Sequence, residues 1–293
     1  MRWPLASIPS PSSGEIEVGP LTLHAYGFML LLAIVAATTL TGILWTRRGG
    51  EWDLVFRVAM WGVAGGIVGA RLYHVATSWS EIDDPKWKGI LEIWEGGLGI
   101  WGGIGAGVLV GWIVIHRAGA SMFAFMEAAA PGLLLAQAIG RWGNYFNEEL
   151  FGVPTNRPWG LEISPENAAE AGYPGSDTFH PLFLYESLWS LLGVGVLLLL
   201  YRRGRVRPPG IFCLYVAWYT FARFFLEQIR TDDAHEYLGL RLNAYVSLVV
   251  FGLGIAAFVW SQRRPERPRG RAKPAPAPAR KMAVPKGRVR PRR

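Results

Sequence analysis

The sequence predicts an all-α integral membrane protein with seven transmembrane helices. The mean hydropathy is +0.21 and 51% of the residues are hydrophobic. Apolar runs alternate with short polar connections, and basic residues collect on every second connection. Because a crossing needs about 20 apolar residues, seven runs qualify as spans. They are residues 21–45, 54–77, 98–115, 122–139, 182–200, 211–226 and 244–260, the sixth being the shortest.

The orientation of the spans follows from their basic ends. Arg47 follows the first span, Arg117 the third, a four-arginine cluster at 202–207 the fifth, and a basic tail the seventh. These ends share one face, which the positive-inside rule makes cytoplasmic. The opposite connections are acidic: residues 81–95 contain five carboxylates and residues 148–180 contain six. We therefore expect the N-terminus outside, the C-terminus in the cytoplasm and a bacterial plasma-membrane location.

The two ends of the chain differ in character. Residues 1–20 contain Pro, Ser and Glu in place of an apolar core behind basic residues, so we expect no cleavable signal. Residues 263–293 hold 13 of the 30 basic residues and one acidic residue, which leaves residues 1–262 with a net charge of −4. We expect this tail to be disordered and to adhere to anionic lipid headgroups, and no motif favours nucleic acid.

The second and third spans are each predicted to present one smooth face for close packing against another helix. Both carry small residues at four-residue spacing, which lets helix backbones approach one another. Packing explains this pattern better than ligand binding does. The residues are Gly62, Gly66 and Ala70 in the second span and Gly99, Gly103, Gly107 and Gly111 in the third.

Ionisable residues inside the spans are the stronger functional signal. Each costs about 2.5 to 3.5 kcal/mol at the bilayer centre, so each is expected to face protein or water. They are Arg71 in the second span, Glu127 in the fourth, Arg141 at the outer end of the fourth, Glu186 in the fifth, and Arg223 and Glu227 in the sixth. Arg71, Arg141 and Arg223 fall in the outer half, where three guanidinium groups can surround one phosphate. A simple ion pair between Arg223 and Glu227 remains an alternative.

A polar, glycine-punctuated segment follows the fourth span. Residues 140–152 read GRWGNYFNEELFG and contain Arg141, Asn144, Asn147 and Glu149 at a helix mouth. Hydrocarbon offers these groups no hydrogen-bond partner, so the segment is typical of a site. The single cysteine, Cys213, and the five histidines form no metal-ligand spacing, and we expect neither a metal nor another cofactor.

This segment resembles the signature of the bacterial prolipoprotein diacylglyceryl transferase family. Further family-like pieces occur in family order over about 230 residues. They are LHAYG at 23–27, GARL at 69–72, HPLFLYE at 180–186, and RFFLE at 223–227 with Arg230 and Asp233. The resemblance implies transfer of the diacylglyceryl group of phosphatidylglycerol to the lipobox cysteine of a prolipoprotein. It also implies a small head and arm facing outward, at about residues 141–180, and we expect the protein to act as a monomer.

The resemblance also implies roles for particular residues. Arg141 and Arg223 would stabilise the phosphate as it leaves, with Tyr26 near the lipid and Glu149 beside the arginines. Phosphatidylglycerol would be bound by Arg141, Asn144, Asn147, Gly152, Arg71 and Glu227. Glu227 would hold Arg223, and Gly152 would permit a backbone turn.

One departure leaves the general base open. Trp101 stands where known family members place a histidine, and we expect it to have a packing or lipid-contact role. His24, His180, Tyr26 and Glu149 are candidates for the proton acceptor, and the field of the arginines alone is another.

The outward connection at 151–179 is too long for a plain loop. Its Trp159, Tyr173 and Phe179 are expected to be interfacial anchors or to pack within the loop. Two other functions remain open for the whole chain. One is a transporter of organic anions, for which we find no inverted repeat, and the other is an anionic-lipid-binding protein without chemistry.

Overall fold

The computed structural model describes residues 7–11, 13–18, 21–93, 96–232 and 236–264 of the 293-residue chain. The chain divides into two units, 1–262 and 263–293, and the helices belong to the first apart from the last residue of the final helix. The predictions about Asp233 and about the tail beyond residue 264 fall outside the described residues.

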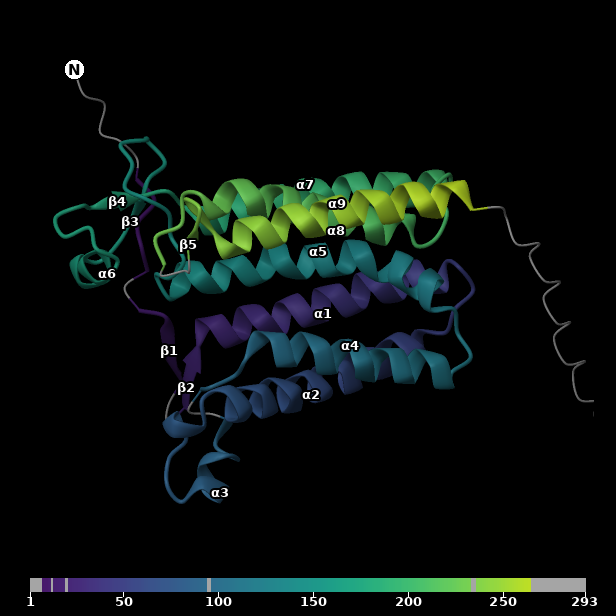
Figure 1. Cartoon of the computed structure of the whole chain (residues 1–293), viewed down its shortest axis with the longest axis horizontal. Helices are drawn as coiled ribbons and strands as arrows, with labels where there is room; N and C mark the ends of the chain where they lie inside the picture. The colour runs from purple at the N-terminus through teal and green to yellow at the C-terminus, as the bar shows by residue number, and fades with distance from the viewer. Residues whose placement is uncertain (1–6, 12, 19–20, 94–95, 233–235, 265–293) are drawn as a thin grey trace, which may run out of the picture. The chain divides into compact units, whose positions relative to one another are not determined.

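The structure is predominantly helical (Figure 1). Six helices are long and apolar enough to cross a membrane. They are α1 (Ala25–Thr46), α2 (Trp52–Thr77), α4 (Ile100–Arg117), α5 (Met122–Phe146), α7 (Leu182–Arg203) and α9 (Leu242–Arg263). The sixth predicted span forms α8 (Gly210–Glu227), which packs against α5 and α7 but is not one of these six. An all-helical body with six candidate spans is therefore confirmed, and the seventh span stays a prediction.

Two predicted spans have different bounds in the structure. The first begins as strand β2 (Leu21–His24), which pairs with β1 (Glu15–Val18), so the helix starts only at Ala25. The fourth was expected to end at residue 139, but α5 continues to Phe146. Arg141 and Asn144 therefore lie on the helix and not in a head that begins at residue 141. The helix ends where Glu148 and Leu150 adopt φ values of 49° and 56°.

A small mixed element lies between α5 and α7. It contains α6 (Pro165–Glu170) and the antiparallel pair of β3 (Leu161–Glu162) and β4 (Thr178–Phe179). Its interior includes Phe151 and Phe179, whose rings lie 4.8 Å apart. Phe179 is fully buried, so of the two roles expected for it, packing within the loop is confirmed and the interfacial anchor is wrong, whereas Trp159 is exposed.

The predicted close-packing faces of α2 and α4 are confirmed, and the two helices pack on each other. A Cβ on Gly107 would lie 3.1 Å from the carbonyl oxygen of Gly62, and one on Gly66 would lie 3.4 Å from that of Gly103. Small residues on both helices allow this separation. Shorter elements complete the described chain: a 3-10 turn at Trp79–Glu81, α3 (Lys86–Gly89), β5 (Glu236–Tyr237) and β6 (Leu240–Arg241).

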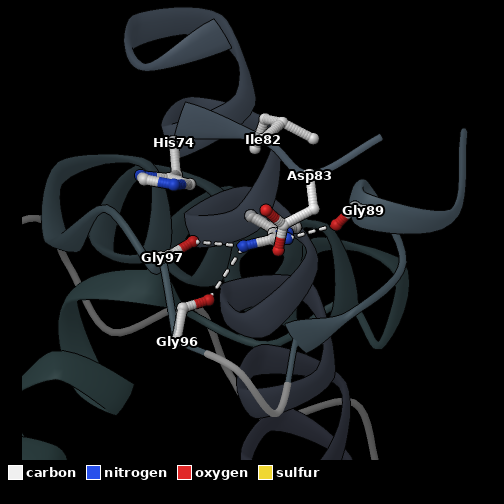
Figure 2. A pocket seen from close by; sticks show the side chains of 7 residues that line it. His74, Ile82, Asp83, Gly89, Gly96 and Gly97 are labelled. Atoms are coloured by element: carbon white, nitrogen blue, oxygen red, sulfur yellow. Dashed lines mark hydrogen bonds between the residues drawn. The ribbon is translucent and has the colours of Figure 1, made fainter. Parts of the chain in front are cut away.

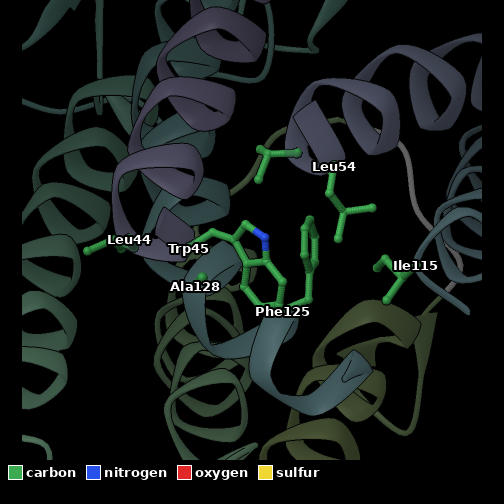
Figure 3. Packing of buried hydrophobic residues seen from close by; sticks show 7 residues of the cluster. Leu44, Trp45, Leu54, Ile115, Phe125 and Ala128 are labelled. Atoms are coloured by element: carbon green, nitrogen blue, oxygen red, sulfur yellow. The ribbon is translucent and has the colours of Figure 1, made fainter. Parts of the chain in front are cut away.

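An apolar cluster lies where α1 ends and α5 begins. The rings of Trp45 and Phe125 meet edge to face at 5.3 Å, and Leu54 and Ile115 pack nearby (Figure 3). Beside this cluster the fully buried Glu127 accepts a hydrogen bond of 2.6 Å from the backbone N–H of Ile211. A carboxylate at this place complements the N-terminus of α8, the helix that carries Arg223 at its other end.

Candidate functional site

Two arginines from different helices meet at one glutamate. Arg141, on α5, places its Nη2 2.5 Å from Oε2 of Glu186, on α7. Arg223, on α8, places its Nη1 3.8 Å from Oε1 of the same glutamate. All three side chains are largely buried. The structure therefore brings together two of the three arginines that the sequence analysis assigned to one anion.

The network extends along α5 on one side. Arg141 Nη1 donates a hydrogen bond of 3.3 Å to Oδ1 of Asn144. Asn144 in turn donates from Nδ2 to Oε1 of Glu149 at 2.7 Å. This spacing arises because Arg141 and Asn144 are three residues apart on one helical face. The ring of Tyr26 lies against α5 at Gly143, the residue before Asn144, since a Cβ on Gly143 would lie 2.6 Å from Tyr26 Cδ2.

The network also extends beyond α8. The fully buried Glu227 lies 2.8 Å from Nη2 of Arg223 and 3.5 Å from Nε of Arg241. It also accepts a hydrogen bond of 3.1 Å from Nδ2 of Asn243. Arg230 approaches the same carboxylate at 4.0 Å. The expected contact between Glu227 and Arg223 is thus present, and it is one of several.

Asp232 closes the outer end of this network. It accepts two hydrogen bonds from Arg230, at 2.5 and 2.7 Å, and lies 3.3 Å from Nη2 of Arg241. Burial alone raises the pKa of the Asp232 carboxyl, but the hydrogen bonds and charge of Arg230 hold that pKa below its ordinary value. Asp232 is therefore a stable anion that keeps Arg230 and Arg241 in place.

Gly152 is needed for close approach and not for a turn. Its N–H donates to the carbonyl of His180 at 2.9 Å, and the next N–H, of Val153, donates to the carbonyl of Ile229 at 2.8 Å. A Cβ on Gly152 would lie 2.8 Å from His180 Cβ and 2.9 Å from the Ile229 oxygen. Left-handed φ values occur at Glu148 and Leu150, and Gly152 is not in that region. The predicted turn at Gly152 is therefore wrong.

Comparisons with known proteins agree with this arrangement. A sequence profile of the prolipoprotein diacylglyceryl transferase family matches residues 14–260. The chain belongs to this family. It is 46% identical over 267 residues to the phosphatidylglycerol-prolipoprotein diacylglyceryl transferase of Streptomyces griseus, covering 90% of this chain and 80% of that protein. It is 41% identical over 272 residues to the protein of the same name from Bifidobacterium adolescentis, covering 88% and 81%.

Other residues that the family resemblance pointed to lie apart from the arginine network. Arg71 donates hydrogen bonds to the carbonyls of Ile90 at 3.0 Å, Gly96 at 2.8 Å and Gly97 at 3.0 Å, and to that of Gly89. Arg71 lines a small polar pocket, and Figure 2 shows the Gly89, Gly96 and Gly97 carbonyls around it. Within the described residues, Arg71 has no contact with the network, and its hydrogen bonds hold the connection between α2 and α4.

The candidate bases also differ in their surroundings. His24 is exposed and lies 3.2 Å from Glu15, whereas His180 Nδ1 lies 3.1 Å from the Tyr185 hydroxyl. Burial lowers the pKa of His180, and the positive charge of Arg157 lowers it further. Asn147 ends α5, with no side-chain hydrogen bond among the described residues.

The sequence analysis missed three members of the site. Arg241, Asn243 and Asp232 lie in or next to the segment between α8 and α9, and none belongs to the motifs quoted above. One signal was present: Arg241 directly precedes an apolar run, where a charge needs a partner. Trp101 is 62% exposed on the surface of α4.

Proposed function

We propose that the protein transfers the diacylglyceryl group of phosphatidylglycerol to the thiol of a prolipoprotein's lipobox cysteine. The products are a thioether-linked lipid and glycerol phosphate. The observation that carries this proposal is the convergence of Arg141 and Arg223 on Glu186, in a chain whose relatives bear the name of this transferase.

The reaction needs positive charge at the phosphate. The cysteine thiolate attacks the glyceryl carbon next to the phosphate, the carbon–oxygen bond breaks, and its electron pair stays on the phosphate oxygen. Arg141 and Arg223 stabilise that developing charge, because fixed guanidinium groups in a water-poor site lower its energy in the transition state. Glu227, Asn144 and Glu149 keep the two guanidiniums in position. Asn147 and Gly152 are part of the same headgroup site.

The proton of the thiol needs only modest help to leave. A free cysteine thiol has a pKa of about 8.5, so a positive field alone makes a useful fraction of thiolate at neutral pH. Glu149, which reaches Arg141 through Asn144, and Tyr26, whose ring lies against α5 at Gly143, are the proton acceptors that the network favours. His24 and His180 are less suited, since their contacts are with Glu15 and Tyr185.

The site faces the outer side of a bacterial plasma membrane. In this proposal α8 is the seventh span, the N-terminus is outside and the protein acts as a monomer. Packing of α8 against α5 and α7 supports the seventh crossing, and the basic ends of α4 and α7 support the orientation. Arg71 orders the outer connection, and its contact with the lipid headgroup stays a prediction.

A direct assay tests the function. Purified protein is incubated with phosphatidylglycerol and a lipobox peptide, and the peptide is analysed by mass spectrometry for an added diacylglyceryl thioether. We expect product with the cysteine peptide and none with a matched serine peptide. Absence of product over several lipid compositions contradicts the proposal, and anion uptake by loaded vesicles in the same preparation would favour a transporter.

A further inference from the structure

The carboxylate of Glu186 occupies the position between the two key guanidiniums. Its Oε2 is 2.5 Å from Arg141 and its Oε1 is 3.8 Å from Arg223, and its side chain is 8% exposed. The neighbouring residue on α7, Ser187, accepts a hydrogen bond of 3.3 Å from the Trp142 indole on α5. The two helices are thus joined beside the site, which fixes the place of the carboxylate.

The contact with Arg223 is incomplete. Arg223 Nη1 is buried and, within the described residues, makes no hydrogen bond, although Glu186 lies 3.8 Å away. A buried guanidinium donor without an acceptor is costly, because it has lost its water. An anion with two or more oxygens placed between Arg141 and Arg223 would satisfy it. Glu186 and such an anion would compete for the same space and the same donors.

The charges of the described network cancel. Four arginines and four carboxylates are connected by the contacts given above: Arg141, Arg223, Arg230 and Arg241, with Glu149, Glu186, Glu227 and Asp232. An electroneutral cluster of this kind can accept one extra negative charge more readily than two, because the first added charge leaves the cluster net negative and so opposes the second. Removing one carboxylate would change that preference.

The substrate and the product of the proposed reaction differ in charge. Phosphatidylglycerol is a phosphodiester with one negative charge. Glycerol phosphate is a phosphomonoester, which carries about −1.5 to −2 at pH 7. A site with surplus positive charge would hold the product more tightly than the substrate and would release it slowly.

We propose that Glu186 determines the charge specificity of the site. It is the resident anion that the substrate phosphate displaces from between Arg141 and Arg223, and its charge makes the site select a phosphodiester over a phosphomonoester. This inference rests on the proposed function, because it assigns the two phosphates as substrate and product. It gives Glu186 a part in product release that an ion pair alone would not have.

Calorimetric titration of the purified protein tests the inference. The ligands are glycerol 1-phosphate and glycerophosphoglycerol, the deacylated diester. Glu186→Gln should bind the monoester at least about tenfold more tightly than wild type does, with a clearly smaller gain for the diester. Glu170→Gln removes an exposed charge from α6, outside the network, and should stay within about threefold of wild type for both ligands.

A measurement on the wild-type protein makes the test independent of variant folding. Between about pH 5 and pH 8 the monoester gains its second charge, so its affinity should fall while that of the diester stays constant. A monoester affinity that rises with pH, or an equal gain for both ligands in Glu186→Gln, overturns the inference. Failure of the proposed function would instead appear as absent thioether product in the wild type, whatever the titrations give.

Discussion

Substitution of Gly152 by alanine tests how the head segment positions the arginine network. The added Cβ would lie 2.8 Å from His180 Cβ and 2.9 Å from the Ile229 oxygen. An ordinary contact begins near 3.4 Å, so the neighbouring segments must separate by about 0.6 Å. Overpacking of this kind costs about 1 to 3 kcal/mol. The movement reaches Arg230, which pairs with Gly152 in the backbone and lies 4.0 Å from Glu227.

We therefore expect Gly152→Ala to fold with a lowered thermal midpoint and to lose about tenfold to a hundredfold in turnover. The loss follows because a displacement near 1 Å can cost about a hundredfold in rate. Initial rates of peptide modification and a thermal unfolding curve measure the two effects. Gly252→Ala in α9 is the control, since a Cβ there meets nothing within 4 Å. Wild-type turnover in Gly152→Ala would refute this account of the glycine.

Three further predictions concern single side chains. Glu227→Gln leaves Arg223 without its counter-charge at 2.8 Å, and breaking a buried ion pair costs about 3 to 5 kcal/mol of stability. Both the thermal midpoint and the turnover should therefore fall sharply. Near-normal values of both would show that the pair is dispensable. Trp101→Ala should fold normally and keep its turnover within about twofold of wild type, because the side chain is 62% exposed. Loss of turnover in a folded variant would assign Trp101 a direct role. Because the pKa of His180 is lowered in the folded protein, the unfolded chain takes up the proton first, and stability is lost as the pH falls below about 6.5. The thermal midpoint should therefore drop less between pH 7 and pH 5 in His180→Asn than in wild type. An equal drop in both proteins would contradict this prediction.

The membrane-spanning body could be predicted from the sequence because it depends on local hydropathy. The runs at 54–77 and 182–200 became α2 and α7 with ends shifted by a few residues. The β2 strand was missed since Leu21–His24 is apolar enough to extend the first span, and only its pairing with β1 makes it a strand. The end of α5 was missed because the residues after 139 are polar and do not extend the apolar run, although tertiary partners keep Arg141 and Asn144 on the helix.

The site was partly predictable for a related reason. Arg141, Arg223 and Glu227 carry charge inside apolar runs, which marks them in one sequence. Asp232 and Arg241 lie in a short polar connection where charged residues are ordinary, and Asn243 lies in the first turn of α9. Their role depends on the return of the chain to the end of α8, which is a tertiary fact. The placement of Arg71 was also beyond the sequence, because its partners are backbone carbonyls.

The arginine pair is the centre of this account, and one measurement tests it directly. Thioether formation is followed by mass spectrometry for wild type, Arg141→Ala, Arg223→Ala and Arg57→Ala, with phosphatidylglycerol and a lipobox peptide. Arg57 pairs with Asp53 at 2.8 Å on an exposed helix face and is the matched control. The account predicts full product with wild type and Arg57→Ala and none with either network variant. Normal turnover in Arg141→Ala or Arg223→Ala, with the fold intact, would contradict it.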